Sequence, residues 1–172
     1  MGMSQAIKTC LSKYFTFSGR ASRSEYWWFA LFVILASAAL AVIDALVFGS
    51  DPETNKTNTV LSNLFQLAMI FPLLTAGWRR LHDSGKPGWY ILLPMLVSVV
   101  FLMGLLSGVV TFGLIEGQGV DPDALRGPAA VLGVTGIAVF WVAQITLAVL
   151  MIWWLTRPSD DRTNRFGSKP VS

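Results

Sequence analysis

The residues best suited to chemistry lie in one polar run, Arg79-Arg80-Leu81-His82-Asp83-Ser84-Gly85-Lys86-Pro87-Gly88-Trp89, between two long apolar stretches. An aspartate beside an imidazole can set the tautomer of the ring, so His82 and Asp83 are candidates for acid–base or metal-hydrolase chemistry. Adjacent residues in a turn, however, rarely point at one reacting atom. Asp83 before Ser84-Gly85 is equally a turn signal with side-chain-to-backbone hydrogen bonds. We therefore favour a structural role for this motif and assign no catalytic residue.

The same run does not match other known site patterns. Gly85-Lys86 lacks the upstream glycine and the following Ser or Thr of a phosphate-binding P-loop. Gly85 is instead predicted to occupy a turn that requires positive φ, and Gly88 and Trp89 complete the motif. Cys10 is the only cysteine and His82 the only histidine, so metal ligands are scarce. We expect no metal and no cofactor.

Basic residues suggest a second kind of chemistry, which is phosphate binding. Arg79 and Arg80 close an apolar stretch, Lys86 follows in the next turn, and Arg20 and Arg23 precede another apolar stretch at the same expected membrane depth. Guanidinium groups that converge there would bind the phosphate of an anionic lipid in forked geometry. The alternative is that these cations only orient the chain and compensate helix dipoles.

Three further polar side chains fall inside the apolar stretches. Asp44 lies about one turn from the far end of the first stretch, Gln66 lies at a comparable depth in the second, and Gln144 lies near the middle of the fourth. An ionisable residue in a membrane is a candidate functional site. Water access or a hydrogen bond to Gln66 would also satisfy Asp44, and one interhelical hydrogen bond would satisfy Gln144.

Composition identifies the elements that must position these residues. The chain is 53% hydrophobic and 13% charged, whereas soluble domains carry about 25% charged residues. We predict an all-α membrane protein with four transmembrane helices and a short N-terminal interfacial amphipathic helix. The expected parts are an interfacial helix and basic motif at 1–25, a transmembrane domain at 26–155 and a polar tail at 156–172. The spans are expected at about 27–48, 60–78, 89–115 and 131–155.

Local signals refine the ends of these helices. Ser22 and Glu25 stand at the spacing of a capping box, so Ser22 is predicted to begin the first spanning helix. Pro72 and Pro94 are predicted to interrupt the second and third spans and to leave the carbonyls of Ala68 and Tyr90 without helical partners. The result is either a pair of kinks that shape the bundle or a vestibule beneath the basic loop.

The distribution of Lys and Arg predicts orientation. Eleven of the 13 lie in the N-terminal segment, the central polar run and the C-terminal tail, and only Lys56 and Arg126 lie in the other two loops. Short cytoplasmic segments carry an excess of Lys and Arg. We therefore expect a multi-pass protein with both termini and the central loop in the cytoplasm.

Three motifs together, Phe17-Ser18-Gly19-Arg20-Ala21-Ser22-Arg23-Ser24-Glu25-Tyr26-Trp27, the central run and Asn164-Arg165-Phe166-Gly167, resemble those of the bacterial domain of unknown function 805 family. The resemblance covers nearly the whole chain in order. It implies a small bacterial inner (plasma) membrane protein with these motifs in the cytosol, and it implies no activity.

Three classes of function stay open. The first is a non-enzymatic scaffold or adaptor that binds anionic lipid or a partner. The second is a transporter or channel subunit, which the sparse polar lining of the spans disfavours. The third is a membrane enzyme that acts on a lipid-linked substrate through His82 and Asp83, which lacks a complete catalytic constellation. The expected partner is the phospholipid bilayer and its anionic lipids. A homo-oligomer or another membrane partner is left open, and no nucleic acid is expected.

Overall fold

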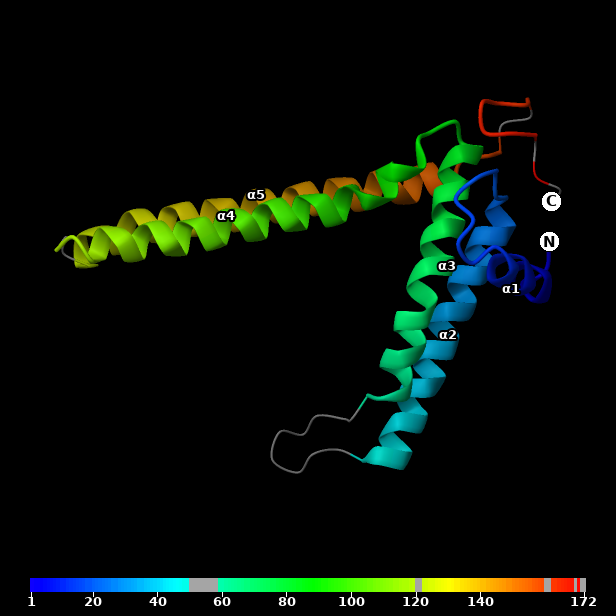
Figure 1. Ribbon diagram of the computed structural model, residues 1–172, viewed down its shortest axis with the longest axis horizontal. Helices are drawn as coiled ribbons and strands as arrows, with labels where there is room; N and C mark the ends of the chain where they lie inside the picture. The colour runs from blue at the N-terminus through cyan, green and yellow to red at the C-terminus, as the bar shows by residue number, and fades with distance from the viewer. Residues whose placement is uncertain (50–58, 120–121, 160–161, 169, 171–172) are drawn as a thin grey trace. The chain divides into compact units, whose positions relative to one another are not determined.

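The computed structural model describes residues 1–49, 59–119, 122–159, 162–168 and 170. Within them, every regular element is a helix (Figure 1): α1 (Met3–Ser12), α2 (Arg23–Phe48), α3 (Leu61–Asp83), the 3₁₀ helix η1 (Gly88–Leu92), α4 (Leu93–Glu116) and α5 (Pro122–Thr156). Four stretches are long and apolar enough to cross a membrane, namely Arg23–Phe48, Leu61–Asp83, Gly88–Ile115 and Val131–Thr156. The predicted all-α class with four spanning helices is thus confirmed, as is the existence of a short N-terminal helix.

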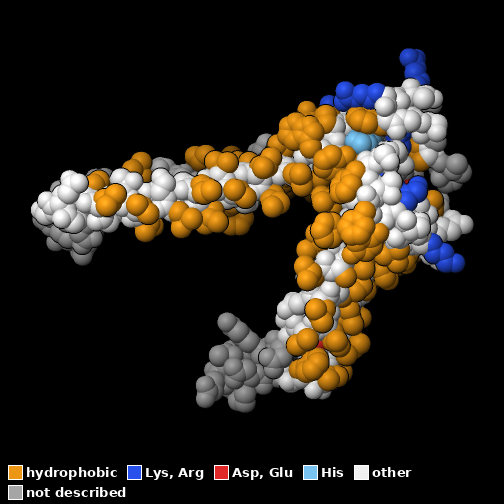
Figure 2. Space-filling view, in the orientation of Figure 1, with side chains coloured by type: hydrophobic (Ala, Val, Ile, Leu, Met, Phe, Trp, Pro, Cys, Tyr) orange, Lys and Arg blue, Asp and Glu red, His pale blue; other side chains and the backbone are white. Residues whose placement is uncertain are grey.

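The chain forms two compact units. The first consists of Met1–Ile91 and Trp154–Ser172, and the second of Leu92–Trp153. In both, large apolar side chains cover the outside of the spanning helices, as the orange surface in Figure 2 shows. Such an inside-out distribution suits helices whose solvent is lipid.

In the first unit, α2 and α3 run side by side and α1 packs against them (Figure 1). Ala6 and Cys10, four residues apart and therefore on one face of α1, are fully buried. Cys10 packs with Phe29 of α2 and Ala76 of α3 in a small apolar core. One face of α1 is therefore committed to the helix pair.

The start of α2 agrees with prediction in part. Ser22 is the N-cap, and its hydroxyl accepts a hydrogen bond from the Glu25 backbone N–H at 3.2 Å. The predicted reciprocal half of the capping box is wrong, because the Glu25 carboxylate accepts from Arg79 at 2.6 Å instead. An ion pair with a buried guanidinium is a stronger interaction than a bond to a terminal amide.

The end of α3 differs from prediction. The helix was expected to end near residue 78, but it continues through the basic residues to Asp83, and the chain turns only at Ser84–Pro87. Gly85 has φ 73°, which confirms the predicted positive φ. The polar run was mistaken for a loop because its charges mark the end of the apolar stretch and not the end of the helix.

The two prolines play different parts. Pro72 lies inside α3, and the hydroxyl of Tyr14 donates to the carbonyl of Ala68, whose helical partner the proline removes. Pro94 lies in the first turn of α4, where a proline needs no hydrogen-bond partner, so the predicted interruption of the third span is wrong. Of the two prolines, only Pro72 therefore interrupts the hydrogen bonds of a helix.

Asp44 ties the other end of α2 to the start of α3. Its carboxylate accepts from the backbone N–H groups of Leu61 at 2.9 Å and Ser62 at 2.8 Å and from the Ser62 hydroxyl at 2.7 Å. It thus caps α3 from a neighbouring helix, where negative charge also suits the helix dipole. These bonds satisfy the Asp44 carboxylate without Gln66, the alternative partner, which is exposed.

The second unit is the pair α4 and α5, which lie side by side (Figure 1). Phe101 and Phe140 stack with ring centroids 4.3 Å apart. The Gln144 amide donates to the Pro94 carbonyl at 3.1 Å and to the Ser98 hydroxyl at 2.7 Å. The predicted interhelical role of Gln144 is confirmed.

Candidate functional site

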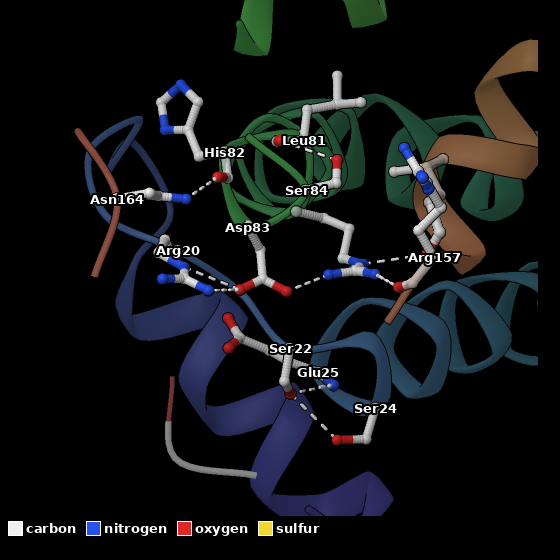
Figure 3. A network of polar contacts seen from close by, with 12 residues as sticks. Arg20, Ser22, Ser24, Glu25, Leu81, His82, Asp83, Ser84, Arg157 and Asn164 are labelled. Carbon is white, nitrogen blue, oxygen red and sulfur yellow. Dashed lines mark hydrogen bonds and ion pairs between the residues drawn. The ribbon is translucent and has the colours of Figure 1, made fainter. Parts of the chain in front are cut away.

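The candidate site is an ion-pair cluster at the polar end of the first unit, where the three sequence motifs meet (Figure 3). Asp83, at the end of α3, lies between two guanidinium groups. Arg20 donates to Asp83 Oδ1 through Nε at 2.9 Å and pairs with it through Nη2 at 2.8 Å, and Arg80 donates to Oδ2. All three side chains are fully buried. Helix α3 positions Asp83 and Arg80 three residues apart, on one face.

The two arginines use their remaining donors on the C-terminal part of the chain. Arg80 donates through Nε to the Leu155 carbonyl at 3.0 Å and through Nη2 to the Arg157 carbonyl. Arg20 donates through Nη1 to the carbonyls of Arg162 at 2.8 Å and Gly167 at 3.3 Å. Two buried cations therefore share one carboxylate and attach the tail to α3.

A second ion pair joins α2 to α3. Arg79 Nη1 donates to Glu25 Oε1 at 2.6 Å, and the Cys10 sulfur lies 3.9 Å from the same oxygen. Arg79 Nε and Nη2 are buried without a hydrogen-bond partner among the described residues. Ordered water is the usual partner of such groups. Burial, and secondarily the Glu25 charge, raises the pKa of the Cys10 thiol to about 12, which keeps it protonated near neutral pH.

His82 packs against the tail and not against Asp83. Its Nδ1 lies 3.1 Å from the Gly19 carbonyl, and its ring stacks on Phe166 with centroids 3.8 Å apart and planes at 2°. Its backbone carbonyl accepts from the Asn164 amide at 2.9 Å. Figure 3 shows the imidazole directed away from the Asp83 carboxylate. The geometry gives these neighbours separate partners, so they do not form an acid–base pair.

The tail motif is shaped to make these contacts. Asn164 and Gly167 form an isolated antiparallel bridge, with N–H···O distances of 3.2 and 3.0 Å. The Asn164 side chain accepts from the Phe166 N–H at 2.9 Å, which holds the ring over His82. Sequence reasoning gave Asn164 and Phe166 no role, although both stand in a motif that carried the family resemblance.

The five basic residues predicted to bind phosphate fall into two groups. Arg20, Arg79 and Arg80 are buried in the ion pairs described above. Arg23 is exposed, and Lys86 is half-buried with its ammonium 5.6 Å from the centre of the Trp154 ring. Anionic-lipid binding stays a prediction, and its accessible candidates are now Arg23 and Lys86.

The glycine and tryptophan that close the central motif are placed differently. Gly88 is buried, and a Cβ added there would lie 2.1 Å from the Trp78 ring, so the close approach requires glycine. Trp89 is 47% exposed, and its ring packs edge-on against Tyr90. Within the described residues, no group of three or more His, Cys, Asp or Glu side chains could hold a metal ion.

A cavity of about 420 Å³ adjoins the cluster in the first unit. Its wall combines charged side chains from α1, the N-terminal motif and α2 with the backbone of the tail: Met1, Thr9, Lys13, Gly19, Arg20, Glu25, Phe166, Gly167, Ser168 and Pro170. Its volume lies within the range of about 300–1,000 Å³ typical of small-molecule sites. The cavity is therefore large enough for a small molecule, and residues of the N-terminal and tail motifs line it.

Among the described residues, four apolar helices are long enough to span a membrane, and a polar cluster joins the ends of α2, α3 and α5. These features define a small polytopic membrane protein. A family model described as protein of unknown function DUF805 matches residues 14–168, which include all three motifs. The chain belongs to this family.

Curated relatives agree on the membrane. The chain is 40% identical over 83 residues to inner membrane protein YhaI of Escherichia coli, a match that covers 48% of this chain and 64% of YhaI. It is 28% identical over 93 residues to inner membrane protein YhaH of the same organism, covering 54% of this chain and 74% of YhaH. No solved structure matches the chain. With its four apolar helices, the protein is an integral inner-membrane protein.

Proposed function

We propose that this protein is a non-enzymatic membrane scaffold whose basic end faces the cytoplasm and binds anionic lipid headgroups or an acidic partner. The observation that carries the proposal is that the side chains best suited to catalysis already have partners within the protein or are buried. His82 contacts Gly19 and Phe166, Asp83 binds two arginines, and the Cys10 thiol is buried. Side chains held this way maintain a shape and do not turn over a substrate.

Charge supports the orientation of this end. The N-terminal segment, the central run and the C-terminal tail contain eleven of the chain's 13 Lys and Arg, and Figure 2 shows blue side chains at the end of the first unit where the termini lie. The exposed members are Lys8, Lys13, Arg23, Arg157, Arg162 and Arg165. Each basic residue near an anionic surface contributes about 1 kcal/mol to membrane attraction.

Paired charge-removal variants test the lipid part of the proposal. Arg23→Gln with Lys86→Gln should lower retention of phosphatidylglycerol by the purified protein about 30-fold, because two attractive charges of about 1 kcal/mol each are lost. Lys56→Gln with Arg126→Gln removes the same amount of charge outside the three basic segments and should leave retention unchanged. Native mass spectrometry measures both. Equal retention by the two double variants would reject binding at the basic end.

A further inference from the structure

The cavity between α1, the Gly19-Arg20 segment and the tail brings opposite charges into one enclosure. Lys13, at the end of α1, and Glu25, in the first turn of α2, both line it. Both charges act on the pKa of the Cys10 thiol, Glu25 raising it and Lys13 lowering it, which places both within electrostatic reach of that sulfur. The wall thus offers the ammonium group of Lys13 and the carboxylate of Glu25 to the same cavity.

The remaining guanidinium of the wall has no donor to spare for a ligand. Arg20 directs Nε and Nη2 to Asp83 and Nη1 to the carbonyls of Arg162 and Gly167. A simple anion would therefore meet the Glu25 carboxylate without a forked partner to offset the repulsion. Simple phosphate is consequently a poor occupant.

Glu25 and Lys13, unlike Arg20, keep hydrogen-bonding capacity for a ligand. Among the described residues, only Oε1 of Glu25 receives donors, from Arg79 and from the Cys10 thiol. Lys13 is exposed and takes part in none of the ion pairs that join the described residues. One wall can accept hydrogen bonds from an ammonium group, and the other can donate to an anion.

The expected depth of the cavity in the membrane indicates where such a ligand comes from. Glu25 lies three residues after the Ser22 N-cap, at the first turn of a membrane-spanning helix and next to Trp27 and Trp28. Tryptophans at the end of a span mark the headgroup layer. The cavity therefore opens at the depth where phospholipid headgroups reside.

We propose that this cavity binds a primary ammonium joined to a phosphate, as in the headgroup of phosphatidylethanolamine, with the ammonium on Glu25 and the phosphate on Lys13. The site shares Lys13 with the exposed basic residues of the proposed function, but it does not depend on Arg23 or Lys86, whose removal tests that function. Because attraction and repulsion nearly balance for a zwitterion, binding here should respond weakly to salt, unlike binding of anionic lipid.

Native mass spectrometry of the full chain with defined lipids tests the site. Phosphatidylethanolamine should be retained about tenfold more than phosphatidylcholine, whose methylated ammonium has no N–H to donate to Glu25. Lys13→Gln should remove most of this retention, whereas Lys8→Gln, on the same helix but outside the cavity wall, should not. Equal retention of the two lipids, or equal losses in the two variants, would overturn the proposal.

Two further experiments refine the test. The first asks whether the free headgroup binds without its acyl chains, and the second fills the cavity without changing a charge. If soluble phosphoethanolamine competes with the lipid, the headgroup alone is sufficient for binding. If the lipid is retained and phosphoethanolamine does not compete, the acyl chains are also required. Thr9→Phe fills the cavity from α1 without touching an ion pair and should abolish retention, with Ser4→Phe as the exposed control. Unchanged retention in a Thr9→Phe protein that melts like the control would contradict the assignment.

Discussion

Asp83 joins Arg20 of the N-terminal motif to Arg80 of α3 at the polar end of the first unit. Its carboxylate is shared by two buried guanidinium groups, which in turn bind carbonyls of the tail. Removing one member of a buried ion pair strands the other charge in a low-dielectric environment, at a cost of about 3–5 kcal/mol. The buried arginines are thus explained by internal pairing, which orientation alone would not require.

Asp83→Asn should therefore lower the free energy of unfolding by about 3 kcal/mol or more, because Arg20 and Arg80 lose their common anion. Thermal or denaturant unfolding in detergent measures the change. Arg23→Gln, which removes an exposed charge, should stay within about 0.5 kcal/mol of wild type. A loss below about 1 kcal/mol in Asp83→Asn would mean that the shared carboxylate is not buried as described.

Cys10 should be chemically inert in the folded protein. With its pKa raised to about 12, its thiolate fraction at pH 8 is roughly a thousandfold lower than that of an ordinary thiol, and burial also blocks access. Iodoacetamide should modify it only after unfolding. Ser12→Cys in a Cys10→Ala background, an exposed position on the same helix, should react readily. Labelling of native Cys10 at the rate of that control would show that α1 does not pack on α2 and α3.

At the scale of elements, close packing of α3 against η1 requires Gly88. A Cβ at this position would lie 2.1 Å from the Trp78 ring, which cannot bend away like the end of a flexible chain. Gly88→Ala should lower the melting temperature by several degrees, since overpacking costs about 1–3 kcal/mol. Gly104→Ala, which meets open space in α4, should not lower it.

A second substitution makes this test specific. If the clash is with Trp78, then Trp78→Leu should make Gly88→Ala nearly neutral in that background. Additive effects of the two substitutions would mean that the glycine is needed for another reason. Differential scanning fluorimetry of the wild type, the two single variants and the double variant measures how far the two effects on melting temperature depend on each other.

Sequence reasoning located the spanning helices because hydropathy and length are local properties. It misplaced the end of α3, since charges at a membrane surface do not stop a helix that tertiary contacts continue to stabilise. It also missed the partners of Glu25, Asp44 and Phe166. Those pairings join residues far apart in the chain, and their register is set by packing between elements, which single-sequence periodicity does not contain.

At the scale of the whole molecule, the three sequence motifs are explained by their contacts with one another. The N-terminal motif, the end of α3 and the tail meet in a single buried cluster, so they must lie on the same side of the membrane. An even number of spans between them is consistent with that requirement. The positive charge of these segments places that side in the cytoplasm under the proposed function.

Single-cysteine accessibility in intact cells tests this central claim most directly. In a Cys10→Ala background, a membrane-impermeant maleimide should label Asn55→Cys and Asp123→Cys from outside, and should label Ser84→Cys and Ser168→Cys only after the membrane is permeabilised. Labelling of Ser84 and Ser168 from opposite sides would contradict the shared cluster. Labelling of both from outside would reverse the proposed orientation.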